Sequence, residues 1–530
     1  MHWTDVPPLR PETHFGRAMR CFTDRPLNLN AMFVDAVARH GDREALVDGG
    51  QRLDYAKLDR IADRLAGHFH RLGLARGDRI ALYLGNEREF VHALLACLRL
   101  GAIAVPVNVR EQRPELAFIL NQCGATAIVF DAALADRIPA PADAPALSVR
   151  LSVDGAVPGA LAFDELLETH SPQGPHADPD GEEPAVLLYT SGTTGRPKGA
   201  VLTHLNVIHS VLHYGFCMRL TSADRSLLAV PASHVTGLVA ITLAMFAVGG
   251  CVVMLREFKA RAFLELAARE RMTHTLVVPA IYNLCLRDPD FGRFDLSAWR
   301  VGGFGGAPMP EGTIRALAER LPGLTLTNAY GATETTSPTT IMPMGRQAAN
   351  LDSVGAVVPC GDVRVMDDSG REVAPGESGE LWIAGPMVVP GYWENPEATA
   401  REFANGYWKS GDIGSIDARG FVRVFDRKKD MINRGGYKIY SAEVESVLSL
   451  HPLVVESALV AVPDPVLGEK AHAYVVTRDP ACGADLLRAH CAQHLADYKV
   501  PDFFVFRSEP LPRNANGKLL KRALRDVQSG

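Results

Sequence analysis

The chain has 530 residues, of which 47% are hydrophobic and 22% are charged, a balance typical of a globular protein with about three to four folding units. Its formal net charge of -6 and its pI near 6.3 argue against nucleic acid as a partner, because proteins that bind nucleic acids carry clustered positive charge. Nine cysteines without a CxxC pair favour reduced thiols in a cytoplasmic protein over a disulfide framework or a zinc site. The first twenty residues lack the basic and apolar segments of a signal peptide.

The first part of the chain alternates patterns typical of helices and strands. Apolar residues recur at helical spacing from Leu58 to Leu72, and Gly73 ends the run. The next predicted elements are a strand over 79–84, a helix over about 87–100, a strand over 102–108, a helix over 114–124 and a strand over 125–131. Strands that alternate with helices of this length need right-handed crossovers, so the sequence predicts parallel sheets covered on both faces.

A loop of small and hydroxylated residues follows a polar stretch, residues 171–184, that we expect to be a surface linker. The apolar run Ala185–Leu188 leads into YTSGTTGRPKG, residues 189–199. Such a loop can offer backbone N–H groups and hydroxyls to an anion, and Lys198 adds a positive charge. A Walker A loop needs Ser or Thr directly after its lysine, whereas this chain has Gly199 there. The loop therefore predicts phosphate binding, but only weakly a P-loop NTPase.

Residues 226–255 carry no formal charge and resemble a membrane span at first sight. A spanning helix needs about 20 continuous apolar residues. A proline, polar residues and glycines interrupt this stretch at Pro231, Ser233, His234, Gly237, Gly249 and Gly250. We therefore expect a buried helix followed by a core strand at residues 251–255, and not a membrane span.

Three further motifs suit a nucleotide. VGGFGGAPMP, residues 301–310, follows an apparent strand end at Trp299 and lets a flat ring approach the backbone. NAYGATETT, residues 328–336, offers an aromatic ring, a hydroxyl and, at Glu334, a carboxylate that could anchor Mg²⁺. KSGDIG is expected to place Asp412 in a turn, where its carboxylate can accept hydrogen bonds from ribose hydroxyls.

From about residue 345 the pattern changes to short strands separated by Gly, Pro and Asp turns, which predicts a small β-rich subdomain. Residues 430–530 then have the pattern of a compact α+β unit. The chain is thus expected to be an α/β protein with a large N-terminal part of α/β subdomains, the β-rich subdomain, and a small α+β C-terminal part.

The motifs YTSGTTGRPKG, NAYGATETT, KSGDIG, DRKKDMINRGGYKIYSAEVE and PRNANGKLLKR, in this order, resemble those of the adenylate-forming superfamily. That family contains acyl-CoA synthetases, adenylation domains of non-ribosomal peptide synthetases and insect luciferases. The resemblance extends from about Met32 to Arg522. It implies a reaction in two halves: a carboxylate attacks the α-phosphate of ATP to give an acyl-adenylate and pyrophosphate, and a thiol then displaces AMP. It also implies an AMP-binding domain over residues 1–428 and a mobile C-terminal domain over 429–530.

The resemblance assigns a role to each matching position. The β- and γ-phosphates of ATP would lie against Thr190, Ser191, Gly192, Thr193, Thr194, Gly195 and Lys198. Adenine would stack on Tyr330, with Gly306, Ala307 and Pro308 opposite and Asn328 at the exocyclic amine. Thr333 would contact the α-phosphate, Glu334 would bind Mg²⁺, Asp412 with Arg427 would bind the ribose, and His234 would lie beside the acyl carboxylate.

The C-terminal motifs receive roles in the same way. Lys518 matches the lysine on which the first half-reaction depends, because a cation offsets the repulsion between a carboxylate and a triphosphate. Lys429 matches the hinge about which the C-terminal domain rotates. Gly435 and Gly436 would then let the pantetheine thiol pass, and Lys438 would contact phosphate in the second state.

Departures from the family pattern bear on the substrate. PASHVTGL, residues 231–238, lacks the aspartate of amino-acid-activating relatives, and Gly331 stands where acetate-specific relatives have tryptophan. With room added by Thr236 and Gly237, the acyl pocket is expected to take medium- or long-chain, branched or aromatic acids.

The sequence therefore predicts a cytoplasmic AMP-forming acyl-CoA synthetase that uses ATP, Mg²⁺ and CoA. An acyl-AMP ligase that loads a carrier protein is the nearest alternative; the absence of an appended carrier domain after Lys518 favours CoA. A P-loop kinase or ATPase, which would form ADP, and a membrane transporter are the others. A homodimer is compatible with the sequence, which does not fix the oligomeric state.

Overall fold

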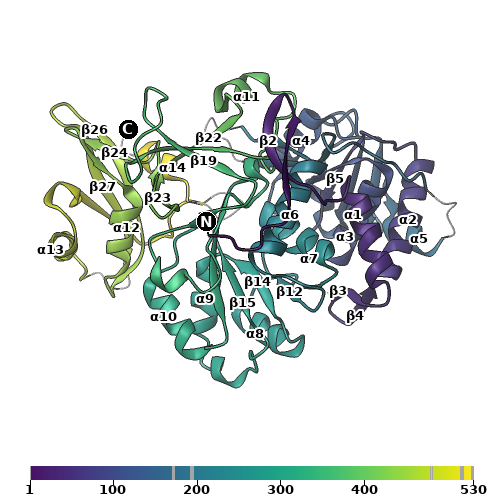
Figure 1. Ribbon diagram of the computed structural model, residues 1–530, viewed down its shortest axis with the longest axis horizontal. Coiled ribbons are helices and arrows are strands. Elements are labelled where there is room, and N and C mark those ends of the chain that lie inside the picture. The colour runs from purple at the N-terminus through teal and green to yellow at the C-terminus, as the bar shows by residue number, and fades with distance from the viewer. Residues whose placement is uncertain are drawn as a thin grey trace. The chain divides into compact units, whose positions relative to one another are not determined.

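The computed structural model describes residues 2–169, 174–190, 196–477, 479, 481–513 and 519–526 (Figure 1). The chain forms two compact units. The first comprises Met1–Val363 and Ile383–Trp408, and the second comprises Arg364–Trp382 and Lys409–Gly530. The domain boundary that the sequence predicts at residues 428 and 429 stays a prediction.

A mainly parallel sheet in the first unit has the strand order β11-β10-β6-β5-β7-β8-β9. Its strands are β5 (Arg79–Tyr83), β6 (Ile103–Pro106), β7 (Ala127–Asp131), β8 (Val149–Val153), β9 (Leu161–Ala162), β10 (Pro184–Thr190) and β11 (Lys198–Thr203). The helices α2 (Tyr55–Arg71), α3 (Arg88–Leu100), α4 (Arg113–Cys123) and α5 (Phe163–Glu168) alternate with these strands. The predicted helices and strands are therefore confirmed, but the hairpin of β10 and β11 is antiparallel, which the prediction of parallel sheets missed.

A second sheet runs through the first unit in the order β18-β17-β16-β15-β14-β12-β13-β3-β4. Its strands are β3 (Glu44–Asp48), β4 (Gln51–Asp54), β12 (Arg225–Leu228), β13 (Cys251–Met254), β14 (His274–Val277), β15 (Val301–Phe304), β16 (Thr325–Tyr330), β17 (Thr340–Ile341) and β18 (Gly355–Val357). The six strands from β3 to β16 in this order are parallel neighbours. Beside β14 and β15 lie α8 (Ala260–Arg269), α9 (Pro279–Leu286) and α10 (Glu311–Arg320), as Figure 1 shows.

The glycine-rich segment at residues 301–310 differs from its prediction. The strand does not end at Trp299: Val301–Phe304 is itself strand β15, so the loop begins only at Gly305. The two glycines inside β15 pack against buried side chains of the neighbouring strands, since a Cβ on Gly303 would lie 3.0 Å from Leu276 Cγ. Small residues here let the strand fit between its neighbours.

The uncharged stretch at residues 226–255 folds as β12, a π-helix η2 (Thr236–Leu243), α7 (Ala244–Val248) and β13. Residues Gly237 to Leu243 are all buried. The predicted buried helix and core strand are thus confirmed, with the addition that the helix opens in π geometry. None of the described helices combines the length and the apolarity that crossing a membrane requires.

The remaining elements of the first unit are β1 (Leu9–His14), β2 (Arg17–Phe22), α1 (Leu29–His40), α6 (His204–Cys217), α11 (Pro396–Glu402) and β21 (Phe403–Ala404). The strands β1 and β2 form a hairpin of their own. The capping box of Thr203 and Asn206 begins α6, and the Asn206 amide also donates to the carbonyls of Pro386 and Val388. These contacts fix the segment that leads to α11.

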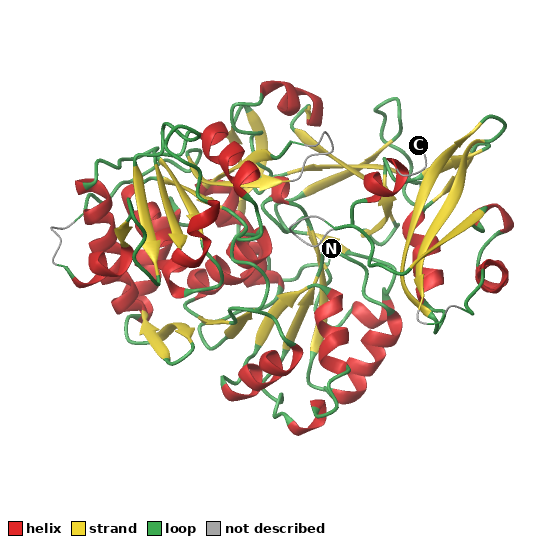
Figure 2. Ribbon diagram, turned by 180° about the vertical axis from the view of Figure 1, so that it is seen from behind, coloured by secondary structure: helices red, strands yellow, loops and turns green. Residues whose placement is uncertain are grey.

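The second unit holds two groups of strands (Figure 2). The first, in the order β19-β20-β22-β23, consists of β19 (Asp362–Met366), β20 (Gly379–Ala384), β22 (Tyr407–Ile416) and β23 (Phe421–Arg427). The second sheet consists of β24 (Ile432–Arg434), β25 (Tyr437–Ile439), β26 (Val454–Asp464), β27 (Gly468–Thr477) and β28 (Phe503–Arg507). Its helices are α12 (Ser441–Ser449), α13 (Ala484–His494) and α14 (Lys521–Asp526). The predicted α/β class with a β-rich part and a small α+β C-terminal part is confirmed.

Candidate active site

The glycine–threonine loop joins two antiparallel strands. Thr190 at the end of β10 lies directly opposite Lys198 at the start of β11, so the chain reverses its direction between these two residues. Residues 191–195, which include the predicted phosphate contacts Ser191, Gly192, Thr193, Thr194 and Gly195, lie outside the described residues. Thr190 is half-buried and Lys198 is buried.

Lys198 has an anionic partner that the sequence analysis missed. Its Nζ lies 2.6 Å from Oε1 and 2.7 Å from Oε2 of Glu402, at the end of α11, and 4.3 Å from the centre of the Tyr392 ring. Desolvation opposes ionisation of Glu402, but hydrogen bonds from Lys198, Tyr392 and Arg401 hold the pKa of this carboxyl below its ordinary value. The lysine and the glutamate therefore form an ion pair.

The segment around Tyr392 is fastened to β11 by backbone contacts. The Trp393 N–H donates to the Gly199 carbonyl at 2.8 Å, and the Val201 N–H donates to the Gly391 carbonyl at 3.1 Å. A Cβ on Gly199 would lie 3.1 Å from the Tyr189 ring, so glycine gives that ring room. This pairing delivers the Tyr392 side chain to the lysine.

Tyr392 also reaches the predicted magnesium ligand. Glu334 lies in a short 3-10 helix, Thr333–Thr335, and is buried. Its Oε1 accepts a hydrogen bond of 2.9 Å from the Tyr392 hydroxyl, which lies 2.6 Å from Oε2 of Glu402 as well. Burial and the two neighbouring carboxylates raise the pKa of Tyr392 far above its ordinary range, so the phenol keeps its proton. Lys198 and Glu334 are thus linked through one side chain.

The group at Glu334 fits a hard cation. Mg²⁺ is typically held by one or two carboxylates together with phosphate oxygens, and the half-buried Thr333 hydroxyl stands next to Glu334 in the chain. A buried carboxylate whose hydrogen-bond partner fixes its orientation is suited to that role.

The predicted adenine contacts gather where two parallel strands end. Asn328 on β16 lies opposite Phe304 on β15, and Tyr330 ends β16. A Cβ on Gly305 would lie 2.3 Å from the Ala329 carbonyl oxygen, so only glycine allows the chain to leave β15 this close to β16.

The next residues, Gly306, Ala307 and Pro308, are exposed, as is Gly331. Ligands of open α/β sheets bind at such carboxyl ends.

His234 lies in the loop after β12, and a buried side chain holds that loop. The Asn86 amide nitrogen donates to the Val230 carbonyl at 3.0 Å and to the Leu255 carbonyl at 3.1 Å, and its oxygen accepts from the Ala232 N–H at 2.8 Å. Asn86 was not singled out from the sequence. Because this buried amide bonds to two backbone carbonyls and one backbone N–H, it holds the loop in position.

The His234 ring itself is exposed, and Thr236 is its hydrogen-bonding neighbour. The Thr236 N–H donates to Nδ1 at 3.3 Å, and the Thr236 hydroxyl lies 3.2 Å from the same atom. A Cβ on Gly237 would lie 2.2 Å from the Pro231 carbonyl oxygen, so the start of the π-helix requires glycine. Among the described residues, no hydrogen bond joins His234 to Glu334.

The second unit holds the predicted ribose contacts, and one expectation is wrong. Asp412 lies within strand β22 and not in a turn. It pairs directly with Arg427 on β23, and the Arg427 Nε lies 2.8 Å from Asp412 Oδ1. Asp412 is buried, so the arginine compensates its charge. The structure therefore brings these two predicted residues together.

The other predicted positions of the second unit lie in turns and at a hairpin. Lys429 is exposed in the turn after β23. Gly435 and Gly436, with φ of 58° and 90°, form the two-residue turn between β24 and β25, a conformation that glycine favours. Lys438 is exposed on β25. Lys518 lies outside the described residues.

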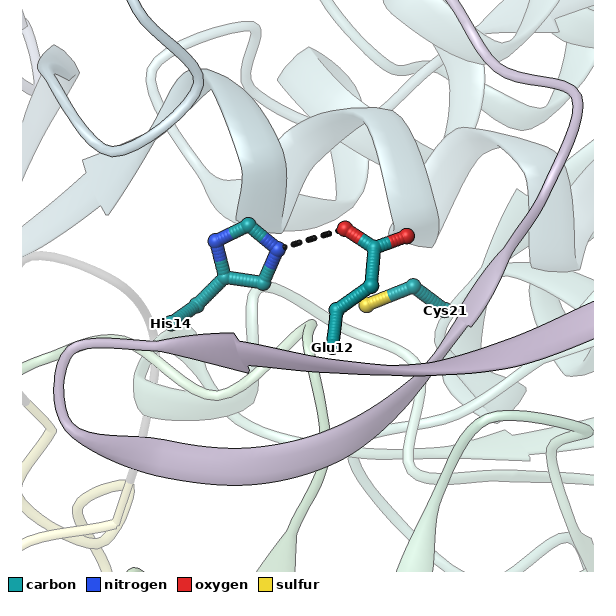
Figure 3. Close-up of side chains that lie close together, drawn as sticks. All are labelled: Glu12, His14 and Cys21. Carbon is teal, nitrogen blue, oxygen red and sulfur yellow. Dashed lines mark hydrogen bonds and ion pairs between the residues drawn. The ribbon is translucent and has the colours of Figure 1, made fainter.

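Another group of side chains, on the β1–β2 hairpin, has the chemistry of metal ligands. In the described ranges, the ligand atoms of Glu12, His14 and Cys21 lie within 4.8 Å of one another on the β1–β2 hairpin (Figure 3). Glu12, however, accepts two hydrogen bonds of 2.7 Å from Arg25 and one of 2.8 Å from Arg10. Burial raises the pKa of the Cys21 thiol to about 11, whereas metals bind the thiolate. We interpret this group as a structural cluster that stabilises the hairpin.

Comparison with known proteins identifies the family. Residues 33–393 match the AMP-binding enzyme family, and residues 443–518 match the AMP-binding enzyme C-terminal domain. The chain belongs to the AMP-binding enzyme family. The resemblance to adenylate-forming enzymes that the motifs indicate is thereby confirmed.

Relatives of this AMP-binding enzyme span nearly its whole length. A long-chain-fatty-acid–CoA ligase of Mycobacterium tuberculosis is 35% identical over 481 residues, which cover 90% of this chain and 93% of the relative. Feruloyl-CoA synthase of Amycolatopsis is 36% identical over 492 residues, covering 91% and 95%. The structure of o-succinylbenzoate CoA synthetase from Bacillus subtilis with its acyl-adenylate intermediate has a TM-score of 0.84 at 30% identity, covering 93% and 98%. The same enzyme with ATP and a magnesium ion has a TM-score of 0.82 at 29% identity, covering 94% and 99%.

Proposed function

We propose that the protein is an ATP-dependent acyl-CoA synthetase that joins a carboxylic acid to CoA through an acyl-adenylate and releases AMP and pyrophosphate. The observation that carries the proposal is the link through Tyr392 between Lys198 and Glu334. A cation for the triphosphate and a carboxylate for Mg²⁺ meet at one place. The relatives described as acyl-CoA ligases support the same reaction.

The first half-reaction needs the two anionic substrates to meet. In our proposal the loop from Thr190 to Lys198 holds the β- and γ-phosphates, and Thr333 contacts the α-phosphate. Mg²⁺, when bound by Glu334, would offset the negative charge of the triphosphate. Lys518 supplies the cation between the acyl carboxylate and the α-phosphate, which is the electrostatic stabilisation that such a transition state needs.

The nucleoside is proposed to bind at the ends of β15 and β16. Tyr330 stacks on adenine, Asn328 faces its amine, and the loop Gly306–Pro308 covers the other face. In the second unit, Asp412 is proposed to accept hydrogen bonds from the ribose hydroxyls, and its ion pair with Arg427 holds its side chain in place.

The acyl carboxylate is proposed to lie beside His234. Since the Thr236 N–H donates to Nδ1, that nitrogen is the acceptor of the neutral ring, and the proton resides on Nε2. Nε2 can therefore donate a hydrogen bond to the carboxylate. Thr236 and Gly331 are proposed to border the space for the rest of the acid, which we place among medium- or long-chain, branched or aromatic acids. Gly237 adds no room of its own, because the Pro231 carbonyl fills the space beside its Cα.

The second half-reaction is proposed to use the C-terminal part of the chain. Lys429 serves as the hinge, Gly435 and Gly436 lie along the path of the thiol, and Lys438 contacts phosphate. Free CoA is the proposed acceptor, and a carrier protein is the second candidate. We place the enzyme in the cytoplasm, because all nine cysteines are buried free thiols.

Product analysis tests the proposal. The purified protein is incubated with ATP, Mg²⁺, CoA and a panel of fatty and aromatic acids, and products are identified by mass spectrometry. AMP and an acyl-CoA that depend on one class of acid would support the synthetase and name its substrate. Acyl-adenylate without thioester would favour the carrier-protein ligase, whereas ADP would contradict the adenylate-forming reaction altogether.

A further inference from the structure

The Tyr392 hydroxyl lies between two carboxylates but has one proton to donate. Its oxygen is 2.9 Å from Oε1 of Glu334 and 2.6 Å from Oε2 of Glu402, and the side chain is buried. Ionised carboxylates only accept hydrogen bonds. The hydroxyl can therefore satisfy one of the two glutamates at a time.

The two carboxylates differ in their other partners. Glu402 is within 2.7 Å of the Lys198 ammonium at both oxygens, and the Arg401 guanidinium lies 2.9 Å from its Oε1. In the described part of the chain, no basic side chain forms an ion pair with Glu334. The hydroxyl lies closer to Glu402 than to Glu334, but Glu402 also has Lys198 and Arg401, whereas Tyr392 is the side-chain hydrogen-bond donor that the described residues provide to Glu334.

Binding of a magnesium triphosphate would change the charges around both carboxylates. The triphosphate would attract the Lys198 ammonium, and a divalent cation held by Glu334 would offset the charge of that carboxylate. The hydroxyl would then donate its hydrogen bond to Glu402, whose lysine would be shared with the ligand. The same tyrosine can donate to either glutamate because its O–H bond rotates about the C–O bond while the ring stays in place.

We propose that Tyr392 is a positioning residue for MgATP: its hydroxyl orients Glu334 for the metal and changes acceptor to Glu402 when the triphosphate draws on Lys198. This inference rests on the proposed function, which assigns Mg²⁺ to Glu334 and phosphates to Lys198. Partners that orient metal-binding side chains typically contribute tenfold to a hundredfold in metal affinity. Tyr392 should therefore contribute to the part of the ATP affinity that depends on the metal.

The test measures ATP binding by calorimetry, in Mg²⁺ and in excess EDTA, without acid or CoA. We define the ratio as the dissociation constant for ATP in EDTA divided by that in Mg²⁺. This ratio isolates the metal-dependent part of the affinity, which a general loss of stability would not change. Tyr392→Phe keeps the ring over Lys198 and removes the hydroxyl. Tyr55→Phe is the matched control, because it removes another buried hydroxyl, one that donates to the Gly250 carbonyl at 2.6 Å.

We expect Tyr392→Phe to lower the ratio about tenfold and Tyr55→Phe to leave it unchanged. Glu334→Gln should lower it at least as far, and adding Tyr392→Phe to Glu334→Gln should lower it no further. An unchanged ratio in Tyr392→Phe, with a reduced one in Glu334→Gln, would overturn this inference and leave the proposed function standing. An unchanged ratio in Glu334→Gln would instead overturn the assignment of Mg²⁺ to Glu334, and this inference with it.

Discussion

Nζ of Lys198 lies 2.6 Å from Oε1 of Glu402, a residue that follows it by 204 positions. The lysine is buried, and the glutamate side chain is 21% exposed. Removing one partner of such a pair leaves the other charge without compensation. The pair therefore contributes to stability as well as to the proposed phosphate site, and the two contributions can be separated by mutation.

Lys198→Met should raise the KM for ATP tenfold or more, because a charge-assisted contact is worth about 1.5–3 kcal/mol. It should also lower the unfolding temperature, since Glu402 loses its buried cation and keeps only the exposed Arg401. The double variant Lys198→Met, Glu402→Gln should recover the unfolding temperature but not the KM. Recovery of both would show that Lys198 acts only through the fold.

Lys518→Ala should slow acyl-adenylate formation by about a hundredfold to a thousandfold, the usual cost of removing one preorganised group at a developing charge. Thioester formation from a supplied acyl-adenylate should be largely spared. Rapid-quench assays of the two steps measure this, with exposed Lys57→Ala on α2 as the control. Equal losses in both steps would contradict a role confined to the first half-reaction.

Asn86→Ala should loosen the loop that carries His234, because it removes the amide that holds the Val230 and Leu255 carbonyls and the Ala232 N–H. We expect a stability loss of about 2 kcal/mol and a raised KM for the acid, with the KM for ATP unchanged. Asn121→Ala on α4, whose amide also donates to two carbonyls but at the surface, is the control. A raised KM for ATP in place of that for the acid would place His234 away from the acyl site.

Local patterns predicted the regular elements well. The helix expected over 87–100 is α3, Arg88–Leu100, and it ends where Gly101 adopts a φ of 75°. Such a glycine stop is visible in the sequence itself. The strand expected over 125–131 is β7, Ala127–Asp131, for which a short apolar run suffices as a signal.

Long-range pairing accounts for what the sequence did not show. Asp412 lies in a segment with turn-like residues, yet its pairing with Arg427 on β23 draws it into a strand. Tyr392 and Glu402 were missed because their partners, Glu334 and Lys198, are 58 and 204 positions distant and no local pattern marks the contact. In GYWENPEATARE, Tyr392 is one of two aromatic residues and Glu402 one of three acidic residues, so nothing local singles them out.

Glu87 should make stability fall as the pH rises. Burial, and secondarily the Asp131 carboxylate, raise its pKa from an ordinary 4.5 to about 7, so the folded protein binds this proton more tightly than the unfolded chain. Its contribution is fully present below pH 4.5 and is lost as the pH rises through 7. Glu87→Gln should therefore be more stable than the wild type at pH 8, by about 3 kcal/mol, and similar to it at pH 5.

Thermal unfolding of both proteins at the two pH values measures this difference. Exposed Glu115→Gln on α4 is the control for the loss of one carboxyl group at the surface. Equal destabilisation of Glu87→Gln at both pH values would mean that the carboxyl is held by hydrogen bonds that an amide cannot replace.

The proposed enzyme makes an acyl-adenylate before any thiol takes part. Exchange of labelled pyrophosphate into ATP, measured with Mg²⁺ and a carboxylic acid but without CoA, tests this order of steps. We predict exchange that requires the acid, since adenylate formation is reversible and releases pyrophosphate. Exchange that requires CoA, or acid-dependent release of ADP without exchange, would contradict the claim.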